Sequence, residues 1–417
     1  MTPDTRQNPP IATAAREFDF TLEAVILITL GLFMFIFGIL LFAIHAGTLP
    51  YAPDSTYGLF LVLVALQVIT MGKTPFGEVR RTWLVVILGI IAGILGMTAC
   101  FIPGALSSIV RVLVGVLLLA GGTALLLQLF LAKDKAAAWI RVPGILRHLT
   151  VACSLVYLLA VILGFVTLLP GLTTNPVTAV LLILYGISLF YLAWGIQVVA
   201  KRYPQKDPSA DPLPVREGAG SFFLRDAPLS FTIAILVFLG VLLSLLAVLL
   251  VPVNLGIIPF SPDGQLGLLI VIMAVQVLAM GETPVGQFRR SWAMVLVGLL
   301  FITLGVVATI VPGLLTSTLV VLLAVLNILG GVIPLTLRVL PMVKALRDPP
   351  AEPVVIPPPL KKLLITQSVL NIVGLLFGLS MLLPGLIPGM VVAIILFANG
   401  LLLFQLARVL TTLPTAA

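Results

Sequence analysis

Long apolar runs alternate with short polar segments along almost the whole chain. Twelve of these runs come close to or exceed the roughly 20 residues with which a helix crosses the hydrocarbon core of a bilayer. They lie near residues 20–46, 58–71, 82–101, 106–131, 149–169, 176–200, 229–252, 265–280, 291–311, 315–338, 363–383 and 388–408. The second and eighth runs are short, and they can extend into their flanking loops. The pattern predicts an all-α polytopic membrane protein with about twelve transmembrane helices.

A segment of the chain occurs twice. Met71 to Trp83 and Met280 to Trp292 both read Met-Gly-x-Thr-Pro-x-Gly-x-x-Arg-Arg-x-Trp, at an offset of 209 residues. The same offset matches other residues outside this segment: Gly31 with Gly240, Asp54 with Asp263, Gln67 with Gln276, Pro103 with Pro312, and Gly121 with Gly330. Such self-similarity indicates a duplicated and fused unit. We therefore expect two tandem six-helix repeats. Since six is even, both repeats enter the membrane in the same direction, which implies a pseudo-two-fold axis along the membrane normal.

The runs and loops divide the chain into five segments. These are an N-terminal segment (1–19), a first repeat (20–200), a linker (201–228), a second repeat (229–410) and a C-terminal tail (411–417). Each repeat is predicted to form three hairpins. The outer turn of the second and third hairpins is a Pro-Gly pair, which ends a helix abruptly because Pro lacks an amide hydrogen and Gly tolerates positive φ. The Pro-rich linker and a second Pro-rich stretch at 346–359 are expected to be extended tethers.

Composition excludes a water-soluble fold. Only 9% of the residues are charged and the mean hydropathy is +1.25, which leaves too little polar surface to cover a soluble core. The net charge of +8 does not indicate nucleic-acid binding, because the predicted spans place all 23 Lys and Arg residues except Arg111 on one side. The positive-inside rule then predicts a bacterial inner-membrane protein with both termini in the cytoplasm. Membrane lipids are the expected partners, with other membrane proteins or further copies of the chain as alternatives.

Catalytic, cofactor and metal constellations are not recognisable in the sequence. Cys100 and Cys153 fall at opposite ends of their predicted helices, too far apart for a disulfide, and His45 and His148 also lie on opposite faces. Acidic residues are absent from the middle of the predicted spans, which argues against a proton-coupled transporter. We therefore expect neither an enzyme nor a cofactor.

The duplicated loop is the first candidate functional element. Its residues are Gly72, Lys73, Thr74, Pro75, Gly77, Arg80 and Arg81 in the first copy, and Gly281, Glu282, Thr283, Pro284, Gly286, Arg289 and Arg290 in the second. The two threonines can cap short helices that the following prolines begin. One interpretation is a tight turn anchored to anionic headgroups, and the other is a loop that binds a partner or gates a path.

Three intramembrane polar residues are the other candidates. Gln67 and Gln276 occupy equivalent places, and their amides either bond neighbouring helices or face a solute near the pseudo-axis. Arg111 has Val320 as its counterpart in the second repeat. It either extends to the headgroups, as long basic side chains do near an interface, or performs a function within the membrane.

Two resemblances follow from these motifs. The run Leu88 to Gly96, the Pro103-Gly104 turn and the later Gly121-Gly122 pair resemble the HdeD-type acid-resistance membrane proteins. This resemblance implies two fused six-helix units with a stress-related role. The duplicated loop also resembles, in position, the Gly-to-Arg-Arg loop of major facilitator transporters, but Phe76 and Val285 replace its acidic residue. We interpret that second likeness as convergence on a basic tight turn.

These observations favour a non-catalytic membrane protein that is stress-related or acts as a scaffold. The alternative is a facilitator for a small neutral or weakly anionic solute, with a path between the two repeats. A cavity near the pseudo-axis lined by Gln67, Gln276 and Arg111 would support the facilitator, whereas a packed centre would support the scaffold.

Overall fold

The computed structural model describes residues 20–71, 73–74, 77–78, 82–131, 144–202, 225, 227, 230–280, 282–283, 286–287, 291–347, 358–383 and 388–412. Within these residues, twelve α-helices are long and apolar enough to cross a membrane, which confirms the predicted fold class. The helices of the first repeat are α1 (Leu22–His45), α2 (Pro53–Met71), α3 (Trp83–Phe101), α4 (Ser107–Leu131), α6 (Ile145–Leu168) and α7 (Asn175–Arg202). Those of the second repeat are α8 (Phe231–Asn254), α9 (Pro262–Met280), α10 (Trp292–Ile310), α11 (Thr316–Arg347), α12 (Pro358–Leu382) and α13 (Gly389–Thr412).

The helix ends follow from local sequence. The Thr21 hydroxyl accepts a hydrogen bond from the Ala24 amide at the start of α1, and Ser230 caps α8 in the same way. The three Pro-Gly turns that the structure describes form as predicted, with positive φ at Gly104 (84°), Gly171 (94°) and Gly313 (82°). Helices α2 and α9 begin at prolines, five and three residues before the apolar runs that predicted them. The two short runs therefore do extend into their flanking loops.

Glycine contacts determine which helices pack together within a repeat. The most extensive pairs are α2 with α3, α4 with α6 and α1 with α7, and the second repeat reproduces them as α9 with α10, α11 with α12 and α8 with α13. A Cβ atom added to Gly58 of α2 would lie 2.5 Å from the carbonyl oxygen of Gly96 in α3. One added to Gly186 of α7 would lie 2.7 Å from that of Gly31 in α1. Small residues allow such close backbone approach, which drives helix association in lipid.

The helices that pack most extensively are not those that the Pro-Gly turns join. The Pro-Gly turns join α3 to α4 and α6 to α7, yet α3 and α4 contact each other only slightly. The first and sixth helices of each repeat pack together instead and close the repeat on itself. Each Pro-Gly turn therefore connects one tightly packed pair to the next.

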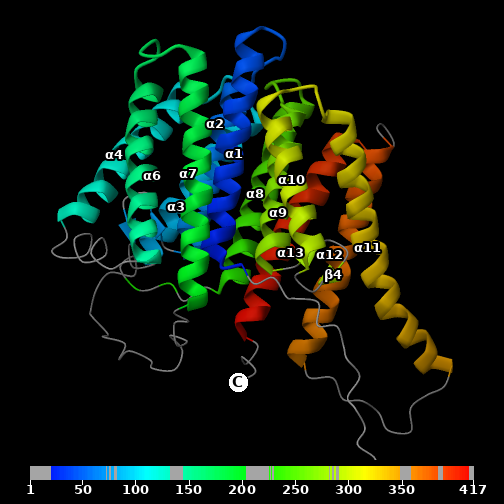
Figure 1. Ribbon diagram of the computed structural model, residues 1–417. Coiled ribbons are helices and arrows are strands. Elements are labelled where there is room, and N and C mark those ends of the chain that lie inside the picture. The colour runs from blue at the N-terminus through cyan, green and yellow to red at the C-terminus, as the bar shows by residue number, and fades with distance from the viewer. Residues whose placement is uncertain are drawn as a thin grey trace, which may run out of the picture.

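The two repeats lie side by side and meet through their first three helices (Figure 1). At one end of the bundle, the Ala52 amide donates a hydrogen bond to the Ile310 carbonyl at 3.0 Å. The Ser261 amide donates to the Phe101 carbonyl at 2.8 Å. Ala52 corresponds to Ser261 in the duplication, and Phe101 corresponds to Ile310. The two bonds are therefore one contact made twice, as a pseudo-two-fold axis requires.

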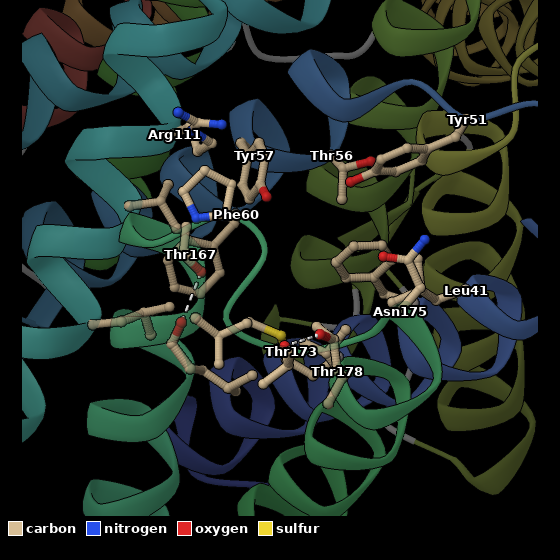
Figure 2. A pocket seen from close by; sticks show the side chains of 18 of the residues that line it. Leu41, Tyr51, Thr56, Tyr57, Phe60, Arg111, Thr167, Thr173, Asn175 and Thr178 are labelled. Atoms are coloured by element: carbon tan, nitrogen blue, oxygen red, sulfur yellow. Dashed lines mark hydrogen bonds between the residues drawn. The ribbon is translucent and has the colours of Figure 1, made fainter. Parts of the chain in front are cut away.

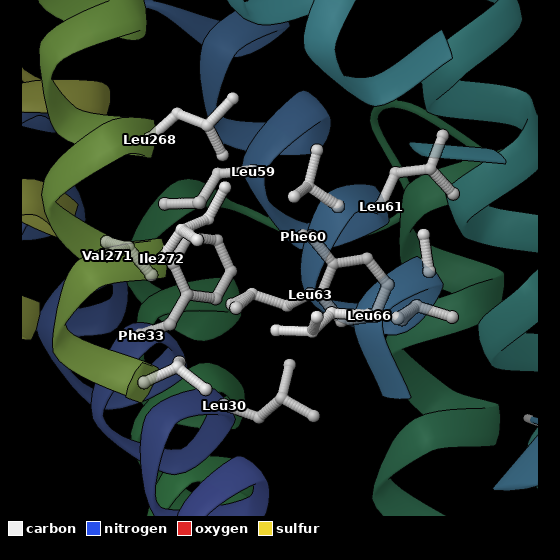
Figure 3. Close-up of a cluster of buried hydrophobic side chains, with 14 of the residues drawn as sticks. Leu30, Phe33, Leu59, Phe60, Leu61, Leu63, Leu66, Leu268, Val271 and Ile272 are labelled. Carbon is white, nitrogen blue, oxygen red and sulfur yellow. The ribbon is translucent and has the colours of Figure 1, made fainter. Parts of the chain in front are cut away.

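Hydrophobic side chains fill the centre of the molecule, where the repeats meet. Phe33 of α1 and Leu59 and Leu63 of α2 pack near Leu268 and Ile272 of α9 (Figure 3). All five are buried. Helices α2 and α9 are the most buried of the twelve described spans. Each of the other helices also carries exposed large hydrophobic side chains, as a lipid surround allows.

Candidate functional site

The duplicated loops form two short β-hairpins. Strand β1 (Lys73–Thr74) pairs with β2 (Gly77–Glu78), and β3 (Glu282–Thr283) pairs with β4 (Gly286–Gln287), both antiparallel. In the first copy Thr74 is the register partner of Gly77, so only two residues separate the strands. The prediction that Thr74 and Thr283 cap short helices is therefore wrong, because each threonine lies in a strand. A Pro-x-Gly sequence suits a tight turn equally well.

Other residues of these loops fall outside the part of the chain that the structure describes. They are Gly72, Pro75, Arg80 and Arg81 in the first copy, and Gly281, Pro284, Arg289 and Arg290 in the second. The predicted contact of the arginines with headgroups remains a prediction.

Gln67 and Gln276 occupy equivalent positions near the ends of α2 and α9, four residues before each helix stops. Both are partly buried. Neither lines the cavity described below. The structure therefore does not bring the two glutamines together with Arg111.

Arg111 lines a cavity of about 250 Å³ that lies inside the first repeat. Its lining residues come from α1, α2, α4, α6 and α7 and from the loops before α2 and α7. Figure 2 shows Arg111 of α4 next to Tyr57 of α2 at one end of the cavity, with Thr173 and Thr178 at the other end. Among the described residues that line the cavity, Arg111 is the only charged one. Its Nε atom is buried and has no hydrogen-bond partner in the described part of the chain.

Several hydroxyl and amide groups share this cavity with Arg111. The hydroxyls of Thr173 and Thr178 bond each other at 2.8 Å, and Thr56 donates to the Ala52 carbonyl at 2.7 Å. Asn175, at the start of α7, lies 3.5 Å from His45 at the end of α1, measured between Nδ2 and Nδ1. These groups make the cavity polar at its rim, whereas most of its other lining residues are hydrophobic.

Tyr51 lies in the loop before α2 and stacks on Phe37 of α1, with ring centroids 5.9 Å apart. Burial is the main cause that raises the pKa of the Tyr51 hydroxyl above its ordinary value, and the neighbouring Tyr57 raises it further. A hydrogen bond with Thr56 opposes this shift. The hydroxyl therefore stays protonated at neutral pH.

The acidic residue nearest in sequence to these tyrosines already has a structural partner. Asp54 accepts a 2.7 Å hydrogen bond from the Gly104 amide in the Pro-Gly turn. Its counterpart Asp263 accepts one from Thr316 at the start of α11. Both acids thus bind the segment that leads into α4 or α11, Asp54 through a backbone amide and Asp263 through a side-chain hydroxyl.

The second repeat lacks most of the polar groups that line the cavity. Tyr51 corresponds to Phe260, Tyr57 to Leu266 and Arg111 to Val320. Aligning the Pro170-Gly171 turn with Pro384-Gly385 also matches Thr167 with Met381, Asn175 with Gly389 and Thr178 with Val392. The packing frame is common to both repeats, so the arginine, the two tyrosines and the asparagine of this lining are particular to the first repeat.

Sequence reasoning identified Arg111 but missed the tyrosines, threonines and Asn175. Each of these residues is unremarkable alone, because Thr and Tyr are common near helix ends. A systematic comparison of the two repeats would have found most of them. Except for Thr56, which corresponds to Gln265, they are positions at which the first copy is polar and the second is not.

Other chemistry is limited in the described residues. They contain no group of three His, Cys, Asp or Glu side chains that could hold a metal ion. Cys100 and Cys153 are both free, as their predicted separation requires. No protein-family model, no curated protein and no solved structure matches this chain.

Proposed function

We propose that this chain is a non-catalytic component of the bacterial inner membrane, with a scaffolding or stress-related role and with both termini in the cytoplasm. The observation that carries the proposal is the buried hydrophobic seam between the repeats, where α1 and α2 pack against α9. A facilitator of the expected kind needs a polar path at this place. A seam of leucine, isoleucine and phenylalanine provides cohesion instead.

The stress-related part of the proposal rests on the resemblance to HdeD-type proteins in the later hairpins of each repeat. The orientation rests on the distribution of basic residues, because the predicted spans place all of them except Arg111 on one side. Lipids are the proposed partners, together with other membrane proteins or further copies of the chain.

Survival of acid shock tests the physiological role. A strain without this protein should survive brief exposure to low pH less well than its parent, and the wild-type protein should restore survival. Gly374→Ala should restore it equally, since a Cβ atom at Gly374 comes no closer than 3.9 Å to Asn327. Equal survival of the deletion strain and its parent would contradict the stress-related role.

A facilitator remains the second candidate function, because the first repeat contains a cavity with a basic residue in it. Proteoliposomes distinguish the two. If the protein is a scaffold, vesicles that contain it should release small organic anions no faster than empty vesicles do. Release that Arg111→Gln abolishes would replace the scaffold proposal with a facilitator that conducts through the first repeat.

A further inference from the structure

The cavity of the first repeat combines a single cation with an extensive apolar wall. Phe33, Phe37, Phe60, Leu118 and Leu163 are among the hydrophobic side chains that line it. Arg111 supplies the only charge among the lining residues that the structure describes. A ligand that matches this lining has one anionic group and an apolar body.

One nitrogen of the Arg111 guanidinium, Nε, is buried without a hydrogen-bond partner in the described residues, although the side chain as a whole is only partly buried. Leaving a buried donor unsatisfied is costly. Asp54, which lies three residues before Tyr57, accepts a hydrogen bond from the Gly104 amide. The planar donor fork of arginine fits the two oxygens of a carboxylate.

We propose that this cavity binds a carboxylate monoanion with a short apolar chain, such as the anion of a medium-chain fatty acid. Arg111 binds the carboxylate, and the hydroxyl of the adjacent Tyr57 donates a further hydrogen bond to it. The aliphatic and aromatic wall surrounds the chain.

Size and charge select this class of ligand. The volume of about 250 Å³ is below the roughly 300–1,000 Å³ of pockets for drug-sized molecules. A single short chain fits this space, whereas a two-chain phospholipid does not. A phosphate dianion would leave one charge unpaired beside a single arginine, and burying an unpaired charge is unfavourable. This inference goes beyond the proposed scaffolding role and does not depend on it.

The second repeat provides an internal comparison. Its helices pair as those of the first repeat do, but Val320 and Leu266 replace Arg111 and Tyr57. The proposed site is therefore expected once per chain.

Photolabelling of the full-length protein in lipid nanodiscs tests the proposal. The probe is a decanoate that carries a diazirine on its chain, and its neutral partner is the matching decanol. Decanoate should label peptides from 51–60, 107–118 or 163–178, and unlabelled decanoate should compete. Arg111→Gln should reduce this labelling at least tenfold, while labelling by the decanol probe should not change. Arg111→Lys, which retains the charge but loses the fork, should give an intermediate result.

Two controls separate binding from folding and from general charge. Arg338 of α11 donates hydrogen bonds to Gln367 and Ser368 of α12, away from the cavity, so Arg338→Gln should leave decanoate labelling unchanged. Thermal unfolding of Arg111→Gln reports whether the variant is folded. Should that variant misfold, Tyr57→Phe, which removes only a hydroxyl, should still weaken decanoate labelling relative to decanol labelling.

Competition also identifies the source of the ligand. Competition by benzoate added to the buffer would indicate an anion taken from water, and competition only by oleate incorporated in the nanodisc would indicate one taken from the bilayer. Either result supports a carboxylate site. Equal labelling of the wild-type protein and Arg111→Gln by decanoate, or labelling spread evenly over both repeats, would overturn the proposal.

Discussion

The backbone amide of Ala52 in the first repeat donates a 3.0 Å hydrogen bond to the carbonyl oxygen of Ile310 in the second. The Ser261 amide makes the reciprocal bond to Phe101. Both bonds use backbone atoms at the ends of buried helices. The contact between the two repeats therefore requires a close approach of their backbones. The first prediction concerns Gly264, which lies at this contact.

Gly264, near the start of α9, has no room for a side chain. An added Cβ atom would collide with the Cys100 carbonyl and lie 2.8 Å from the Ser55 hydroxyl. We expect Gly264→Ala to destabilise the protein by about 1–3 kcal/mol, the usual cost of overpacking. The unfolding midpoint in detergent measures this effect. Gly374→Ala is the matched control, and a midpoint as high for Gly264→Ala as for this control would contradict the close joint.

The second prediction uses the duplication itself. A Cβ atom at Gly58 would lie 2.5 Å from the Gly96 carbonyl, and one at Gly267 would lie 2.5 Å from the Gly305 carbonyl. Because the two contacts are equivalent, Gly58→Ala and Gly267→Ala should lower stability by similar amounts, each about 1–3 kcal/mol. Gly195→Ala should be neutral, since only the Leu149 side chain, at 3.4 Å, faces that position. Destabilisation in one repeat alone would show that the repeats do not pack equivalently.

The third prediction concerns the paired glutamines. If Gln67 and Gln276 only bond neighbouring helices, replacing both with Leu should cost about 0.6 kcal/mol per lost hydrogen bond, a typical value within membranes. Neither residue lines the cavity, so decanoate labelling of the double variant should match that of the wild-type protein. Loss of labelling in a stable double variant would mean that the glutamines act on the cavity.

Topology is the subject of the fourth prediction. Leu172 and Ile257 are exposed in loops at the predicted outer side, and Lys361 is exposed near the start of α12 at the predicted inner side. In a background with Cys153 replaced by Ala, an impermeant thiol reagent should label Leu172→Cys and Ile257→Cys in intact cells. Lys361→Cys should react only after the cells are opened. Labelling of Lys361→Cys from outside would reverse the proposed orientation.

The number of helices and the Pro-Gly turns were predictable from the sequence. The length of an apolar run indicates whether a helix can cross a bilayer, and Pro and Gly restrict the backbone where they occur. Helix pairing was not predictable. Most faces of these helices are apolar, so the polar stripe that marks the exposed side of a helix in a soluble protein is missing. The partner of Gly58 became visible only when the structure placed Gly96 against it.

The candidate site was only partly predictable for a related reason. A lone arginine near the start of a transmembrane helix is conspicuous, and Arg111 was identified on that basis. Tyr51 and Tyr57 contribute to the cavity only because α1, α6 and α7 close around them. The duplicated loop was misjudged because Thr-Pro can begin either a helix or a tight turn, and the two-residue spacing between Thr74 and Gly77 favoured the turn.

The reciprocal backbone bonds at the joint have a consequence for how the two copies can diverge. Amides and carbonyls are present whatever the side chain, so neither copy must retain its polar residues to remain attached to the other. A homodimer of single units would have to change both sites at once with every substitution. Covalent fusion removes that constraint. It allows the second repeat to lose its polar side chains and serve only as a packing partner, while the first repeat retains the cavity.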